Sequence, residues 1–139
     1  MLTTTTNIRE ILSVRQERDV VICRNRVKEV AAKLGMGIVN QTKLITAVSE
    51  LARNMLIYGG GGNVLLQTVT RGREPGVQLI FEDKGPGIAD IKKAMQDGFT
   101  TGKSMGMGLP GAKRLVSEFS IDSTVGKGTT VKIIKWKNG

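Results

Sequence analysis

Glycine most constrains how this chain can fold, because it is frequent and unevenly distributed. The chain has 18 glycines among 139 residues, well above the usual share of about 7%, and most lie between Gly59 and Gly128. Glycine has no Cβ, so the backbone can adopt left-handed turns and other atoms can approach it closely. The second half of the chain is therefore expected to contain loops that require bare backbone.

Apolar spacing predicts the elements that these loops connect. One helical stripe begins after Asp19, the expected N-cap, and ends at Gly35, and a second stripe spans residues 41–58. Two further helices are predicted at 88–97 and 109–118. Strands are predicted at 7–15, 64–69, 77–81, 119–124 and 129–136. The strands 64–69 and 77–81 would form a hairpin around the turn 71–76. This pattern favours an α+β two-layer sandwich, with helices on one face of a mixed, mainly antiparallel sheet. We expect a single domain over residues 1–139.

Composition excludes several kinds of chemistry. The chain has no His and one cysteine, Cys23, which excludes a Cys/His zinc site, an intramolecular disulfide and His-based acid–base catalysis. Catalysis would have to use carboxylates, amides, Lys or Arg side chains, or a bound cofactor. No apolar run approaches the roughly 20 residues needed to span a bilayer, and the N-terminal Thr tract lacks a signal-peptide pattern. We therefore expect a cytoplasmic protein with no membrane partner.

The chain is strongly basic, with 21 Lys and Arg against 12 Asp and Glu and a formal charge of +9. Such an excess attracts nucleic-acid phosphates whatever the fold. However, the five aromatic residues do not alternate with basic residues as they would in a base-stacking surface. Nucleic acid is therefore not an expected partner, and the charge is better suited to attracting an acidic protein.

Two glycine motifs resemble phosphate-binding loops but lack the required context. The segment Gly98–Ser104 has three residues between its glycines where a Walker A loop needs four, and a helix rather than a strand precedes it. The segment Gly106–Gly111 spells G-x-G-x-x-G, but no strand leads into it and no acidic residue follows about 20 positions later. Neither a P-loop nor a dinucleotide fingerprint is predicted.

Four other motifs are individually weak. Glu50 and Asn54 lie one helical turn apart, a spacing that is also typical of a solvated helix face. The segments 83–88 and 126–130 are compatible with ordinary turns, and the segment 106–109 opens a helix whose free N–H groups favour an anion. The order and spacing of all four motifs together are more informative than any one.

In that order, the motifs resemble the boxes of the GHKL family of ATP-binding domains, over residues 19–136. The matching segments are Glu50–Asn54 for the N-box and Asp83–Gly87, Gly106–Leu109 and Gly126–Thr129 for the three glycine boxes. Within that family, the chain is most similar to RsbT-type serine/threonine switch kinases of bacterial stressosome signalling. The segments that carry this similarity are 49–54, 82–88, 97–101 and 108–115.

The resemblance implies a site for ATP and Mg²⁺. Asp83 would accept a hydrogen bond from the adenine amino group, and Thr129 would bind at the same end of the base. Asn54 would give an amide oxygen to Mg²⁺, and Glu50 would orient or deprotonate the attacking hydroxyl. Further nucleotide contacts are expected from Gly85, Gly87, Ile88, Gly102, Lys103, Ser104, Gly106, Met107, Gly108 and Leu109.

The resemblance also has departures. Residues 98–107 would form a short lid over the phosphates. Many relatives have a basic residue or His three places after the N-box Asn, where this chain has Ile57, so Arg53 or Lys103 would have to take over that contact. The chain also lacks a phospho-acceptor His and the second domain that supplies a catalytic Lys in gyrase-like enzymes. These departures disfavour the large ATPases of the family.

The resemblance leaves two functions open. The first is an ATP- and Mg²⁺-dependent protein serine/threonine kinase. It would phosphorylate a STAS-domain antagonist or scaffold protein of a stressosome-like complex, switch between partners and activate a downstream effector on release. The alternative is a non-catalytic, ATP-gated module that binds or activates a partner in the manner of an anti-sigma factor. Phosphoryl transfer needs mainly positioning and charge neutralisation, so a carboxylate, a metal ion and a donor-rich loop would suffice for the first.

Overall fold

The computed structural model describes residues 7–96 and 108–139. Its five strands form one sheet in the order β1-β2-β3-β5-β4, and the four pairings between neighbours in the described chain are antiparallel. The strands are β1 (Arg9–Val14), β2 (Gly62–Arg71), β3 (Glu74–Asp83), β4 (Glu118–Thr124) and β5 (Gly128–Trp136). The helices are α1 (Glu17–Lys33), α2 (Ile38–Gly59), α3 (Ile91–Ala94) and α4 (Gly108–Leu115).

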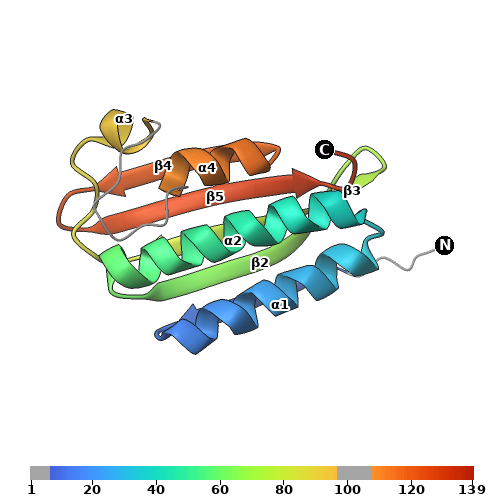
Figure 1. The fold of residues 1–139 in the computed structure, drawn as a ribbon, viewed down its shortest axis with the longest axis horizontal. Coiled ribbons are helices and arrows are strands. Elements are labelled where there is room, and N and C mark those ends of the chain that lie inside the picture. The colour runs from blue at the N-terminus through green and yellow to red at the C-terminus, as the bar shows by residue number, and fades with distance from the viewer. Residues whose placement is uncertain (1–6, 97–107) are drawn as a thin grey trace.

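Helices α1, α2 and α4 lie side by side over one face of the sheet (Figure 1). The core fills the space between these helices and the inner face of the strands. Its largest fully buried side chains include Leu44 of α2, Leu66 of β2, Leu79 of β3 and Ile133 of β5. Burying one such side chain contributes roughly 1.5 to 3 kcal/mol, so the apolar stripes hold the two layers together. The predicted α+β sandwich with helices on one face is confirmed.

Helix α1 begins two residues before the predicted cap. Asp19 is not the N-cap, because the helix starts at Glu17 and Gln16 is the flanking residue. The Asp19 carboxylate instead reaches back and accepts hydrogen bonds from the backbone N–H groups of Arg15 (2.9 Å) and Gln16 (3.2 Å). An acidic side chain in the third helical position bonds the N-cap N–H in this way, as in a capping box. The predicted end at Gly35 is confirmed, since Gly35 follows the C-cap with φ +85°.

Other boundaries also differ from those predicted. Helix α2 extends beyond 41–58 at both ends, and the β2–β3 turn shortens to residues 72 and 73, because Arg71 already pairs with Glu74. Helix α3 has four residues instead of the ten predicted for 88–97, and it begins where the Asp90 carboxylate accepts from Lys93 N–H (3.0 Å). Helix α4 ends at Leu115, because the chain enters β4 at Glu118. Each difference lies at an element's end and leaves the order of elements unchanged.

Candidate functional site

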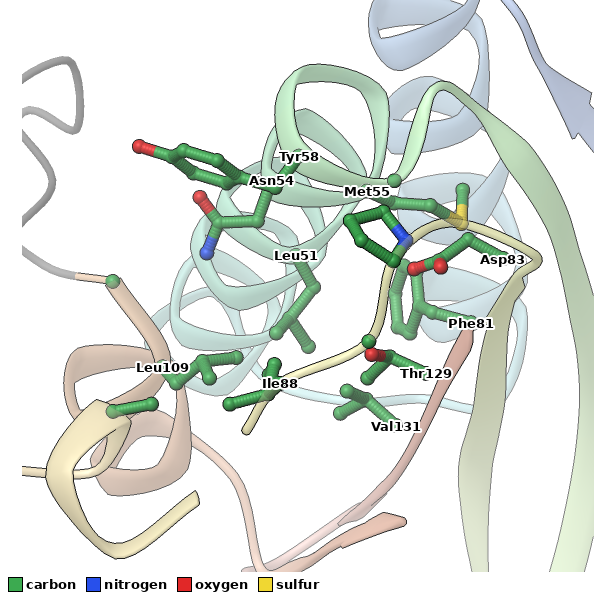
Figure 2. A pocket seen from close by; sticks show the side chains of 15 residues that line it. Leu51, Asn54, Met55, Tyr58, Phe81, Asp83, Ile88, Leu109, Thr129 and Val131 are labelled. Atoms are coloured by element: carbon green, nitrogen blue, oxygen red, sulfur yellow. The ribbon is translucent and has the colours of Figure 1, made fainter. Parts of the chain in front are cut away.

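A pocket of about 360 Å³ lies between the last turns of α2, the segment that follows β3, the start of α4 and the inner face of β5. Its wall is mostly apolar, with polar groups at separate places. Figure 2 shows Asp83 and Thr129 on one side of the pocket and Asn54 and Tyr58 on the other. The lining residues are Leu51, Asn54, Met55, Tyr58, Gly59, Phe81, Asp83, Pro86, Gly87, Ile88, Ala94, Gly108, Leu109, Thr129 and Val131.

The Asp83 carboxylate is fixed by backbone on two sides. Its Oδ1 accepts a hydrogen bond from Gly85 N–H (2.9 Å), and the last residue of α2, Gly59, lies against the same side chain. A Cβ at Gly59 would be 2.5 Å from Asp83 Cγ and 2.6 Å from Oδ2, closer than packed atoms approach. The absence of a side chain at Gly59 therefore makes room for the carboxylate.

Sequence reasoning did not identify Gly59 as a site residue. Gly59 stands first in the run Gly59–Gly62, directly after the helix predicted for residues 41–58, where a glycine is expected simply as a helix end. Gly85 packs directly against the Gly59 backbone, because a Cβ at Gly85 would be 2.7 Å from Gly59 Cα. The signal available in the sequence was a glycine run longer than a helix end requires.

The β4–β5 hairpin holds the segment that follows Asp83. Gly126 N–H donates to the carbonyl of Pro86 (2.9 Å), and Ile88 N–H donates to Ser123 Oγ (2.7 Å). Gly87 has φ +78°, and a Cβ there would collide with the backbone of Thr124. The first and third predicted glycine boxes are therefore one assembled unit at one end of the pocket.

Glu50 lies beside the pocket and contacts its rim. Its Oε2 accepts a hydrogen bond from Gly108 N–H (3.3 Å), the first residue of α4, which itself lines the pocket with Leu109. The Gly108 amide, expected to face phosphates, thus faces Glu50 in this arrangement. One turn further along α2, Asn54 lines the pocket.

The structure brings most of the predicted residues together. Asn54, Asp83, Gly87, Ile88, Gly108, Leu109 and Thr129 line one pocket, with Glu50 and Gly85 in contact with it. The predicted contacts of Gly102, Lys103, Ser104, Gly106 and Met107 lie outside the described residues, as does the predicted lid. Arg53 pairs with Glu17 (Nε to Oε1, 3.2 Å) and is not a lining residue. The structure therefore gives no support to Arg53 as the replacement for the missing basic residue.

The chemistry of the pocket suits a flat apolar ring attached to a polar group. Apolar side chains from α2, β3 and β5 provide the walls, and Asp83 and Thr129 provide hydrogen-bonding atoms at one end. Across residues 7–96 and 108–139, no cluster of three His, Cys, Asp or Glu side chains could hold a metal ion. Asn54 could offer one amide oxygen from the pocket wall, and a single protein contact of this kind would suit Mg²⁺ that takes its other ligands from phosphates and water.

Comparison with known proteins agrees with this geometry. Residues 39–138 match the family model described as histidine kinase-, DNA gyrase B-, and HSP90-like ATPase. The chain belongs to this family, a class of ATP-binding domains, so the predicted GHKL assignment is confirmed.

Two similar proteins indicate which kind of ATP-binding domain within this family the chain is. The chain is 45% identical over 130 residues to the serine/threonine-protein kinase RsbT of Bacillus subtilis, covering 94% of this chain and 98% of that protein. It is 33% identical over 137 residues to an anti-sigma F factor of Thermoanaerobacter, covering 94% of each. The predicted RsbT-like serine/threonine kinase class is therefore confirmed.

Two solved structures share the fold. A crystal structure of RsbU and RsbW domains from Mycobacterium tuberculosis has a TM-score of 0.64 at 20% identity, covering 94% of this chain and 32% of that one. The mycobacterial sensor histidine kinase MprB has a TM-score of 0.55 at 17% identity, covering 93% of this chain and 97% of that one. In the part of the chain that the structure describes, none of the helices is long and apolar enough to cross a membrane.

Proposed function

We propose that this chain uses ATP and Mg²⁺ to phosphorylate a serine or threonine of a STAS-domain protein in a stressosome-like complex. The observation that carries the proposal is the position of Glu50 and Asn54, one turn apart on α2, beside a pocket whose other side presents Asp83. The adenine ring would lie between the apolar walls, with its amino group on Asp83. The triphosphate would then extend toward Asn54 and the start of α4.

The described residues would divide the work of phosphoryl transfer. Asn54 would hold Mg²⁺ through its amide oxygen, and the bound ion neutralises phosphate charge. Glu50 would accept the proton of the acceptor hydroxyl as that oxygen bonds to the γ-phosphorus and the bond to the ADP oxygen breaks. Its Oε2 accepts a hydrogen bond from Gly108 N–H (3.3 Å), and its Oε1 would receive the proton.

A transfer assay tests the kinase proposal. Radiolabelled ATP, Mg²⁺ and a purified STAS-domain protein should give labelled serine or threonine with the wild-type chain. Glu50→Gln keeps the shape but not the basicity, so phosphoryl transfer should fall by about 100-fold or more while ATP affinity changes little. Glu82→Gln is the matched control, because Glu82 is exposed and does not line the pocket. Equal labelling by wild type and Glu50→Gln would exclude the base role.

A second function is supported by the similarity to anti-sigma F factors, 33% identical over nearly the whole chain. In that case the chain would be an ATP-gated binding module in the cytoplasm, and phosphoryl transfer would be incidental. Partner affinity that differs between ATP and ADP, without labelling of the partner, would favour this function. Nucleotide-dependent partner affinity together with labelling of the partner would indicate a kinase that releases one partner and then activates a downstream effector.

A further inference from the structure

The hydroxyl of Ser123, on β4, has three hydrogen-bonding neighbours at the Asp83 end of the pocket. Ser123 Oγ lies 2.7 Å from Ile88 N, 3.1 Å from Gly128 O and 2.7 Å from Thr129 Oγ1. It is half-buried beneath the segment that follows Asp83, and it does not line the pocket itself. Any effect of Ser123 on a ligand must therefore pass through its neighbours.

The three contacts determine where the hydroxyl protons lie. Ile88 N–H can only donate, and the Gly128 carbonyl can only accept. Ser123 has one proton, so all three contacts are hydrogen bonds only if Ser123 donates to Gly128 and Thr129 donates to Ser123. The Thr129 proton is then turned away from the pocket, and Thr129 presents oxygen lone pairs to it.

We propose that Ser123 is a specificity-determining positioning residue, which makes the Thr129 hydroxyl an acceptor toward the purine. This inference rests on the proposed binding of the base at Asp83. In this arrangement the Thr129 hydroxyl and the Asp83 carboxylate both face the 6-position of the purine, and two acceptors at that position favour a 6-amino donor. A 6-oxo purine, as in ITP, places an acceptor oxygen against two acceptors and is disfavoured.

Removal of the Ser123 hydroxyl should change this preference. In Ser123→Ala, the Thr129 proton becomes free to donate to a 6-oxo group, so the preference for ATP over ITP should fall by about 2- to 10-fold. The variant also loses the bond from Ile88 N–H, which loosens the pocket. A looser pocket would weaken the binding of ATP and of ITP by a similar factor and leave the ratio of their Kd values unchanged. A change in that ratio therefore reports the release of the Thr129 proton alone.

Calorimetric titration with ATP and ITP provides the test, using wild type, Ser123→Ala, Thr129→Val and the double variant. Thr129→Val removes the acceptor directly and should also lower the ATP preference. Ser123→Ala should then change the ratio no further, because Ser123 acts through Thr129. Ser120→Ala is the matched control on the same strand, since Ser120 is exposed and outside the pocket, and it should leave the ratio unchanged.

The outcomes separate the inference from the proposed function. A wild-type ATP preference retained in both Ser123→Ala and Thr129→Val would overturn the inference while leaving ATP binding intact. If Ser123→Ala did not fold, a Thr129→Val variant with the wild-type ratio of the ATP and ITP Kd values would by itself overturn the inference. Failure of the wild-type chain to bind either nucleotide would overturn the proposed function and, with it, the inference. Restoration of the ratio by Ser123→Thr, which returns a hydroxyl, would support the assigned proton positions.

Discussion

The close approach of Gly59 to Asp83 predicts that one added methyl group will separate folding from nucleotide binding. In Gly59→Ala the new Cβ would lie 2.5 Å from Asp83 Cγ, about 1 Å closer than the shortest usual carbon–carbon contact of roughly 3.5 Å. The Asp83 side chain must therefore move, and it gives up the hydrogen bond from Gly85 N–H.

The expected loss of affinity follows from the bond that the displaced carboxylate can no longer make. A hydrogen bond to a charged group is worth roughly 1.5 to 3 kcal/mol, so ATP affinity should fall by about 10- to 150-fold. The free energy of unfolding should change less than the binding free energy, by about 0 to 2 kcal/mol. Alanine gains up to about 1 kcal/mol over glycine in a helix, which offsets part of an overpacking cost of roughly 1 to 3 kcal/mol.

Calorimetry with ATP and urea unfolding of the same samples would measure both quantities. Gly37→Ala is the matched control at the other end of α2, because a Cβ there would meet nothing within 4 Å. The control should bind ATP as the wild type does. Wild-type affinity in a folded Gly59→Ala variant would show that the position of the Asp83 carboxylate does not depend on Gly59.

Two further predictions concern stability and reactivity. The hydrogen bond from Arg26 Nε (2.9 Å) lowers the pKa of Glu10, so this pair stabilises the fold above the ordinary carboxyl pKa and ceases to do so as pH falls through the lowered value. Glu10→Gln should therefore reduce the free energy of unfolding by up to about 1 kcal/mol at pH 7. Urea unfolding would measure this difference between wild type and variant, and an equal difference at pH 3 would contradict the prediction. Burial raises the pKa of Cys23 to about 12, so a maleimide should label Cys23 at the rate of global unfolding; rapid labelling of the native chain would disprove its burial.

The sequence predicted the elements well because their apolar periods coincide with burial. The stripe in residues 41–58 became the buried face of α2, and the alternation in 77–81 became the inner face of β3. The ends were less predictable. Ile38 and Val39 belong to α2 but are 65% and 64% exposed, so they add nothing to the stripe from which the helix was predicted.

The site was predictable only as far as its motifs reach. Asp83 and Asn54 lie in recognisable boxes, and the fold places both at one pocket. Gly59 and Ser123 belong to no box, and their roles depend on contacts with Asp83 and Thr129 across the structure. Local sequence carries no record of such contacts, because a helix-ending glycine and a strand serine are ordinary residues in those positions.

The most direct measurement is ATP affinity in Asp83→Asn, because both the proposed kinase function and the proposed role of Ser123 require the adenine base to bind at this carboxylate. The change keeps the size of the side chain but replaces a charged acceptor with an amide. Affinity measured by calorimetry with Mg²⁺ should fall by about 10- to 150-fold, while Asp122→Asn, an exposed control on β4, should bind as wild type. Unchanged ATP affinity in a folded Asp83→Asn variant would contradict the placement of the nucleotide in this pocket.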